Sequence, residues 1–186
     1  HNEELSFLPR AGIVHRLDKD TSGIMVISKS EISYLNLIEQ LKERSVKRTY
    51  LAIVLGAPLA NKIINKPIGR HPKIRTKQAV THNGKEAITR FSVLESLGGY
   101  SLLRVNLETG RTHQIRVHLS HIGYPIVGDP VYGNRSKFSP GSNEAFKKVI
   151  SSFKRQALHA EEIELIHPSS KELISFKASM PSDMQT

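Results

Sequence analysis

Residues 15–23 read His-Arg-Leu-Asp-Lys-Asp-Thr-Ser-Gly and come directly before the apolar run 24–27. Within this stretch, Asp18 stands close to two cations, Arg16 and Lys19. Nearby positive charge favours the anionic form of a carboxyl group, so the sequence predicts an ionised Asp18. If the loop also shields it from water, this carboxylate is a candidate nucleophile or base. The alternative, which the composition of the stretch alone favours, is a surface aspartate in a turn before a strand.

The rest of the chain reverses that preference. Residues 15–23 resemble a motif of the RluA-type pseudouridine synthases, His-Arg-Leu-Asp-x-x-Thr-Ser-Gly, at every fixed position. Residues 109–118, Thr-Gly-Arg-Thr-His-Gln-Ile-Arg-Val-His, and residues 128–133, Gly-Asp-Pro-Val-Tyr-Gly, are similar to two later motifs of that family. Three further segments are most similar to the family branch of large-subunit rRNA pseudouridine synthase D: 9–14, 67–72 and 155–160. The resemblance covers nearly the whole chain. It implies an isomerase that converts specific uridines of large-subunit (23S) rRNA to pseudouridine.

The resemblance also implies roles for individual residues. Asp18 matches the catalytic aspartate, for which attack on uracil C6, attack on ribose C1′ and action as a base all stay open. Tyr50 matches the tyrosine that packs on the target base, although it is otherwise an ordinary strand aromatic. Arg111 matches the arginine that pairs with the catalytic carboxylate, where a two-pronged guanidinium would fix the carboxylate rotamer; the alternative is a surface arginine in a turn. Arg16 matches a residue expected to fill the gap left by the extruded base.

Positive charge is concentrated in one part of the chain. The protein carries 27 Lys and Arg against 17 Asp and Glu, a formal net charge of +10 at pH 7. Residues 44–85 contain ten Lys or Arg and no acid, most densely at 70–77. A one-sign surface of this length is typical of a phosphate-binding strip, although a solvated basic loop without a partner is the alternative. The cations predicted to bind RNA there are Arg70, Lys73, Arg75 and Lys77.

The composition excludes several kinds of site and segment. The 186 residues contain no Cys, which excludes disulfides and thiolate metal sites. No stretch approaches the ~18 apolar residues of a membrane span, and the polar first residues carry no signal-peptide pattern. We therefore expect a cytoplasmic monomer with no membrane association, acting on rRNA stem-loops or a ribosomal precursor particle. No redox centre or organic cofactor is needed for this isomerisation, so no cofactor is expected.

Other groups of polar residues favour structural roles. His113, His118 and His121 lack the spacing of a His-Glu-x-x-His metal site, so packing or phosphate contacts are predicted and no metal is expected. Asp18 and Asp20 resemble the paired carboxylates of a glycosidase, but two acids so close on one loop have no fixed facing geometry. Asp129 is interpreted as an acid that stabilises a turn.

Apolar periodicity and turn residues predict an α+β fold, with a mainly antiparallel mixed sheet and flanking helices. The predicted helices begin after a Ser30 cap and at residue 112, with a short amphipathic segment after a loop at 139–143. The predicted strands are 24–28, 49–55, 88–94, 101–107, 163–166 and 173–176. We expect residues 1–186 to form a single catalytic domain. The resemblance further implies that an N-terminal strand segment and an S4-like RNA-binding domain of the family are absent from these residues.

Two other functions compete with the isomerase. A non-catalytic RNA-binding or ribosome-assembly module would keep the fold but has no need for the candidate catalytic residues. A carboxylate hydrolase of nucleosides would use Asp18 but needs no long track of cations for phosphates. Aromatic residues make up only 6% of the chain, which disfavours stacking along many bases while allowing one flipped base to be held.

Overall fold

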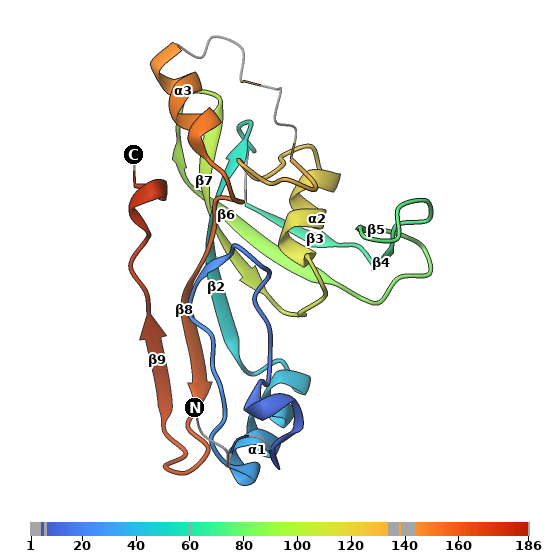
Figure 1. Ribbon diagram of the computed structural model, residues 1–186, viewed down its shortest axis with the longest axis vertical. Coiled ribbons are helices and arrows are strands. Elements are labelled where there is room, and N and C mark those ends of the chain that lie inside the picture. Colours follow the sequence, from blue (N-terminus) through green and yellow to red (C-terminus); the bar gives the residue numbers. More distant parts are fainter. Residues whose placement is uncertain (1–4, 6, 60, 134–137, 139–143, 186) are drawn as a thin grey trace.

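The computed structural model describes residues 5, 7–59, 61–133, 138 and 144–185, which form a seven-stranded sheet, a separate two-stranded hairpin and three α-helices (Figure 1). The large sheet contains β1 (Ser22–Gly23), β2 (Lys47–Leu55), β3 (Lys62–Asn65), β6 (Ile88–Ser96), β7 (Tyr100–Leu107), β8 (Leu158–Ile166) and β9 (Leu173–Lys177). The small hairpin is β4 (Ile68–Arg70) with β5 (Gln78–Val80). The helices are α1 (Glu31–Lys42), α2 (Gln114–His121) and α3 (Glu144–Ser152), with short 3-10 turns η2 (Pro9–Gly12) and η3 (Ser182–Met184).

The sheet is almost entirely antiparallel, as predicted. Its strand order is β1-β8-β2-β7-β6-β3, and β9 also pairs with β8. Within the described residues, only the two-residue β1 runs parallel to its neighbour β8. The α+β fold class expected from the apolar patterns is therefore confirmed.

Strand β2 is the centre of the core. Residues 48–54 are all buried, because β7 and β8 flank the strand and side chains cover both of its faces. Such a strand reads as a continuous apolar run and does not alternate. Ile115 and Leu119 of α2 belong to the same apolar cluster as β2, so this helix is anchored directly to the central strand.

Most predicted elements are present with shifted ends. Ser30 caps α1, and its hydroxyl oxygen accepts a hydrogen bond from the Ser33 backbone N–H. The predicted hairpins correspond to β6–β7 and β8–β9. The helix expected from residue 112 begins at Gln114. The predicted loop at 139–143 lies outside the described residues.

The strand predicted at 24–28 is wrong. Pairing ends at Gly23, and the side chains of Met25 and Ile27 are 39% and 47% exposed. Strand β9 already pairs with β8 beyond the β1 contact, from Glu162 to Ile166, so that part of the β8 edge is occupied. The segment instead runs extended beside α1, where Ile24 and Val26 join a second apolar cluster.

Figure 1 shows the consequence for the shape of the molecule. α1 lies at the lower end, α3 at the upper end and α2 between them, and the β4–β5 hairpin projects to the right. We call residues 68–80, which comprise β4, β5 and the turn between them, the basic arm. None of the helices in the described part of the chain is long and apolar enough to cross a membrane.

Gly23 should be essential for the position of the loop that precedes it. Its φ is +108°, and a Cβ there would lie 2.1 Å from the Ala160 carbonyl oxygen. Gly23→Ala should therefore lower the free energy of unfolding by about 3 kcal/mol or more, because backbone strain is combined with a backbone clash. Gly98→Ala is the matched control, since Gly98 also has a positive φ but a Cβ added there would meet no atom within 4 Å. Gly98→Ala should lower the free energy of unfolding, measured by urea denaturation, by only about 1 kcal/mol. Equal losses would contradict this account.

Candidate active site

The Asp18 loop is held by hydrogen bonds at its centre. The Asp18 carbonyl accepts a hydrogen bond from the Thr21 N–H at 3.0 Å, which closes a turn. The buried Gln156 amide donates to the Lys19 carbonyl at 2.7 Å and to the Thr21 hydroxyl at 3.0 Å. The loop is thereby fixed to the segment that leads into β8. The Asp18 side chain remains 13% exposed, so it is shielded but open to a ligand.

Arg116 joins Asp18 to a second carboxylate. Its Nη1 donates to Asp18 Oδ2 at 3.2 Å, while Nε and Nη2 donate to the two oxygens of Asp129 at 2.8 and 2.9 Å. The second pair is bidentate, the geometry in which a guanidinium holds a carboxylate most firmly. Burial alone would lower the pKa of Arg116, but hydrogen bonds to Asp129 and Asp18 outweigh it and raise that pKa. Arg116 therefore remains a cation.

Asp129 stabilises the turn that follows it, as predicted. Its Oδ1 accepts hydrogen bonds from the backbone N–H groups of Val131 at 2.8 Å and Tyr132 at 3.0 Å. Burial of this fully enclosed side chain would raise its pKa, but the hydrogen bonds from Arg116, Tyr132 and Val131 outweigh burial and lower the pKa. The turn at 128–133 thus supplies a permanent anion that orients Arg116.

Arg111 does not occupy the position predicted for it. Its Nε donates to the Glu86 carbonyl at 2.8 Å, and its backbone N–H donates to Gln114 Oε1 at 2.9 Å. Because α2 begins only at Gln114, Arg111 lies in the preceding turn, whereas Arg116 lies in the first turn of the helix and reaches the Asp18 loop. The ion-pair partner of Asp18 is Arg116, and the prediction for Arg111 is corrected accordingly.

Gln114 is the anchor that fixes where this helix begins. Besides the Arg111 contact, its side chain accepts from the Thr109 hydroxyl at 2.8 Å and donates to Ile88 O and Thr89 Oγ1, each at 3.0 Å. A buried amide with all of these partners holds one orientation. The start of α2, and with it Arg116, is therefore fixed to β6.

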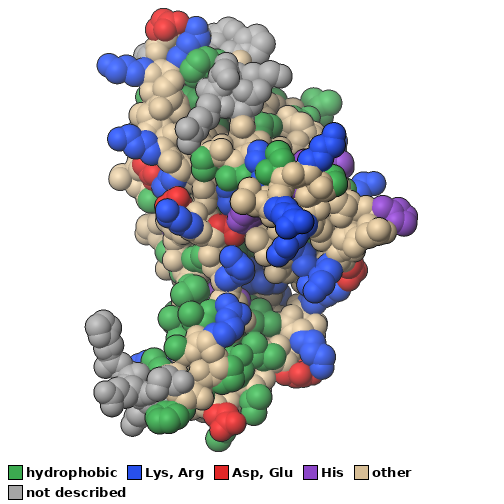
Figure 2. All heavy atoms as spheres, turned by 45° about the vertical axis from the view of Figure 1, so that its right-hand side comes forward, with side chains coloured by type: hydrophobic (Ala, Val, Ile, Leu, Met, Phe, Trp, Pro, Cys, Tyr) green, Lys and Arg blue, Asp and Glu red, His purple; other side chains and the backbone are tan. Residues whose placement is uncertain are grey.

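Asp18 and Tyr50 face a common cavity of about 480 Å³, whose wall also includes Arg16, Arg48 and Arg111. Tyr50 is buried on β2, and burial raises the pKa of its phenol, so the ring is neutral at neutral pH. Arg16 is exposed at the cavity. The space-filling view shows Lys and Arg side chains gathered across the middle of this face of the molecule (Figure 2). The structure thus brings together three of the predicted site residues, with Arg111 present in another role.

Tyr132 connects this site with the basic arm. Its hydroxyl accepts a hydrogen bond from the Gln78 N–H at 2.8 Å and lies 2.8 Å from His113 Nδ1. Its ring stacks against Arg116, with the guanidinium carbon 5.1 Å from the ring centroid. This cation–π contact adds to the ion pairs that hold Arg116.

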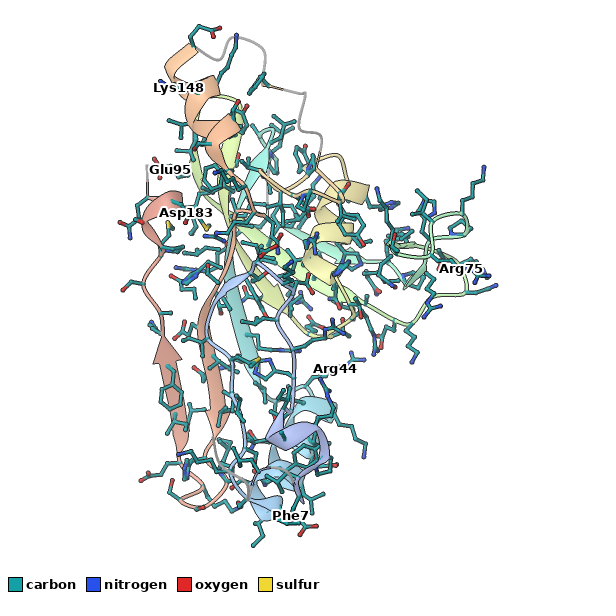
Figure 3. All side chains as sticks on the ribbon, in the orientation of Figure 1. Phe7, Arg44, Arg75, Glu95, Lys148 and Asp183 are labelled. Atoms are coloured by element: carbon teal, nitrogen blue, oxygen red, sulfur yellow. The ribbon has the colours of Figure 1, made fainter. Side chains whose placement is uncertain are left out.

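The basic arm presents its cations unevenly. Arg70, Lys73 and Arg75 are exposed, and Figure 3 shows Arg75 at the outer end of the arm, directed away from the body. Lys77 is half-buried, and its Nζ donates to the Val131 carbonyl at 2.8 Å. Lys77 therefore ties the arm to the Asp129 turn, a role that the sequence did not indicate.

The three histidines have different surroundings. His118 is fully buried, with Nδ1 2.8 Å from Thr89 Oγ1 and Nε2 2.9 Å from Lys66 O. His113 contacts the hydroxyl described above, and His121 is exposed. The packing role predicted for this group is confirmed for His118.

Sequence reasoning missed Arg116, Arg48 and Tyr132 as site residues. Arg116 carried a usable signal, because it stands three residues before Leu119 and so borders the apolar face of the helix, where an unpaired cation would be costly. Arg48 carried no signal, since its burial arises from strands that lie far apart in the sequence.

Comparison with known proteins identifies what this chain is similar to. The sequence model of a family described as RNA pseudouridylate synthase matches residues 2–121. "Ribosomal large subunit pseudouridine synthase D" of Pseudomonas aeruginosa is 48% identical over 183 residues, covering 98% of this chain and 57% of that protein. The proteins of the same name from Nitrosomonas europaea and Escherichia coli (strain K12) are 50% and 48% identical, over 99% and 95% of this chain and 52% and 54% of theirs. The chain therefore spans about half the length of these relatives.

Two solved structures share the fold. "Human RNA Pseudouridylate Synthase Domain Containing 1" superposes with a TM-score of 0.72 at 28% identity, covering 89% of this chain and 67% of that one. "Human RNA Pseudouridylate Synthase Domain Containing 4" gives a TM-score of 0.74 at 26% identity, covering 93% and 72%.

The ion pair of Asp129 predicts a pH-dependent contribution to stability. Asp129→Asn should cost about 3 kcal/mol at neutral pH, since it weakens the pairing of a buried cation. Because folding lowers the pKa of Asp129, this contribution is complete above the unfolded-state pKa of ~3.9 and is lost as pH falls through the folded-state value. Urea denaturation from pH 7 to pH 3 should show the two proteins converging in acid. The control Asp183→Asn, at an exposed ion pair with Arg155, should cost less than about 1 kcal/mol. A gap that stays constant with pH would contradict the argument.

Proposed function

Since this chain belongs to the RNA pseudouridylate synthase family, we propose that it isomerises specific uridines of large-subunit ribosomal RNA to pseudouridine. One observation carries the proposal. The Asp18 carboxylate lies 3.2 Å from Arg116 Nη1 at the wall of a cavity that also contains the buried Tyr50. A carboxylate held in one rotamer beside a neutral aromatic ring is suited to a reaction on a single extruded base.

The reaction requires few groups. The bond between uracil N1 and ribose C1′ breaks, the base rotates, and a bond forms between C5 and C1′ while C5 loses a proton and N1 gains one. Asp18 supplies the reactive oxygen, as a nucleophile at C6 or C1′ or as a base. Arg116, through its hydrogen bond to Oδ2, holds the Asp18 carboxylate in one rotamer at the cavity.

Tyr50 and Arg16 hold the displaced nucleotide and the strand it leaves. The Tyr50 ring offers an apolar face to the uracil, and its neutral hydroxyl is available for proton transfer at C5. The exposed Arg16, two residues before Asp18 on the same loop, fills the space that the base leaves. Extruding a base costs a few kcal/mol, which such contacts offset.

We place the reaction on a ribosomal precursor particle in the cytoplasm. A uridine must leave its helix to enter the cavity, which is easiest before the rRNA is fully packed. The residues of the proposed mechanism, Asp18, Tyr50 and Arg116, meet within one chain, and we propose that it acts as a monomer. The exposed cations of the basic arm, tied to the Asp129 turn through Lys77 and Tyr132, bind the neighbouring phosphates.

Asp18→Asn should abolish isomerisation and leave folding and RNA affinity nearly unchanged. The amide has almost the same shape but cannot serve as nucleophile or base, so the rate should fall about a thousandfold or more. Tritium release from rRNA labelled at uridine C5 measures this rate in the intact protein. Asp20→Asn, an exposed position on the same loop, is the control and should retain activity. Residual activity of Asp18→Asn within about tenfold of wild type, or ~1.4 kcal/mol, would refute the proposed function.

Neutralising the arm should weaken RNA binding in a salt-dependent way. Changing Arg70, Lys73 and Arg75 to Gln should lower the log–log salt slope of binding by about 0.7 to 0.9 for each lost phosphate contact. Lys77 is kept, because it holds the arm in place. Affinity for an rRNA stem-loop at several salt concentrations provides the measurement.

The matched control for the arm removes the same number of charges elsewhere. Lys148, Lys154 and Lys171 are exposed, and Figure 3 shows Lys148 on α3, far from Arg75. Their change to Gln should alter the slope much less than the arm variant does. Equal effects of the two triple variants would show that net charge matters and that the arm makes no specific phosphate contacts.

A further inference from the structure

Arg48 is a buried cation for which the described residues supply no counter-charge. It lies on β2 with only 8% of its surface exposed. Its Nε has no hydrogen-bond acceptor, and within the described part of the chain its guanidinium forms no ion pair. A buried charge without a counter-charge is costly, so such a group signals a ligand that the free protein lacks. Burial also lowers the pKa of this guanidinium, which reflects the same cost.

No carboxylate of the cavity compensates this charge. Among the residues that the structure describes, two carboxylates line the cavity, Asp18 and Glu108. Asp18 is paired with Arg116, and Glu108 is paired with Arg90 on its outer side. Tyr50, two residues along the strand, is a neutral phenol at neutral pH. The positive charge of Arg48 therefore remains available inside the cavity.

The Arg48 guanidinium lies next to the turn that precedes α2. A Cβ on Gly110 would lie 2.8 Å from Arg48 Nη1, so the end of the Arg48 side chain lies against the Gly110 backbone. Gly110 belongs to the turn just before α2, and both residues line the cavity. The Arg48 guanidinium therefore lies at the part of the cavity wall that this turn forms.

His15 lies in the same wall and is uncharged. Burial and the nearby Arg48 lower its pKa to about 4. Its Nε2 accepts a hydrogen bond from the Val26 N–H at 2.9 Å, so the proton of the neutral ring is on Nδ1. That buried Nδ1 also lacks a partner. Arg48 Nε–H and His15 Nδ1–H are therefore both donors without acceptors on this side of the cavity. His15 adds no second positive charge there.

We propose that Arg48 binds a phosphate group of the target nucleotide and thereby positions its ribose over Asp18. The inference rests on the proposed function for the identity of the ligand as a nucleotide of RNA. A phosphate supplies both the missing negative charge and the two oxygens that match a guanidinium fork. A uracil carbonyl supplies one neutral acceptor and leaves the charge uncompensated.

The geometry of β2 determines the direction in which the bound nucleotide would lie. Arg48 and Tyr50 are two residues apart on β2 and therefore project from the same face of the sheet. A nucleotide whose base lies against Tyr50 then has its phosphate toward Arg48, with the ribose between them and beside Asp18. In this arrangement Arg48 positions the substrate, because it contacts the phosphate and does not contact the reacting atoms.

The NMR signal of the Arg48 Nε–H group tests this contact without any need for activity. The signal is identified by its loss in Arg48→Lys, and the intact wild-type protein is titrated with uridine 5′-monophosphate or with uridine at equal concentrations. We expect the signal to shift with uridine 5′-monophosphate, to shift in the same direction with inorganic phosphate, and to stay unchanged with uridine. Equal shifts with uridine and its monophosphate would assign the base as the ligand and overturn the proposal. The absence of a shift with uridine 5′-monophosphate would overturn it as well.

Single-turnover kinetics on an rRNA stem-loop show whether the contact serves the reaction. Arg48→Gln should lower the saturated rate by about tenfold to a hundredfold while changing RNA affinity much less, and Arg48→Lys should restore part of the loss. Arg104→Gln, an exposed cation on β7 outside the cavity, is the control and should change neither quantity. Wild-type rates in a folded Arg48→Gln would refute the positioning role. Failure of the proposed function is a different result, because it would appear as activity in Asp18→Asn while the phosphate-dependent NMR shift remained.

Discussion

The Arg116 guanidinium, shared between Asp18 and Asp129, is the interaction on which the site depends. It joins residues 98 and 13 positions away in the chain, and so it fixes the Asp18 loop relative to the turn at 128–133. Asp129 makes the firmer, bidentate contact and orients the cation, while Asp18 makes a single contact and keeps its second oxygen free of Arg116. The two carboxylates thus differ in position: Asp129 holds the arginine, and Asp18 faces the cavity.

Strand β2 and helix α2 hold the side chains of this site in fixed positions. Strand β2 is buried along almost its whole length and carries Arg48 and Tyr50 on one face. Helix α2 packs on the same core and presents Arg116, with its start fixed by Gln114. Sites built on strands and helices hold their side chains more tightly than sites built on loops alone. The loop that bears Asp18 has its own ties through Gln156 and through Gly23 at the edge of the sheet.

The sequence allowed the family and the fold class to be predicted, and it indicated Asp18 and Tyr50, which line one cavity, because the motifs are local and β2 is a continuous apolar run. It did not allow the partner of Asp18 to be chosen correctly, since Arg111 and Arg116 stand five residues apart in one motif. The choice depends on where the helix begins, and Gln114 fixes that point through contacts to residues on β6. The strand predicted at 24–28 failed for a similar reason, because β9 occupies the neighbouring part of the β8 edge. Both errors concern contacts between distant segments, which local patterns do not encode.

The comparison of Arg116→Lys with Arg111→Lys tests the central claim most directly. Lysine keeps the charge but loses the planar fork, so single-turnover pseudouridine formation should fall about a hundredfold in Arg116→Lys and by less than about tenfold in Arg111→Lys. In an Asp18→Asn background, Arg116→Lys should cause no further loss, because residues that act as one unit are not additive. The account would be contradicted if Arg111→Lys caused the larger loss, or if folded Arg116→Lys turned over at the wild-type rate.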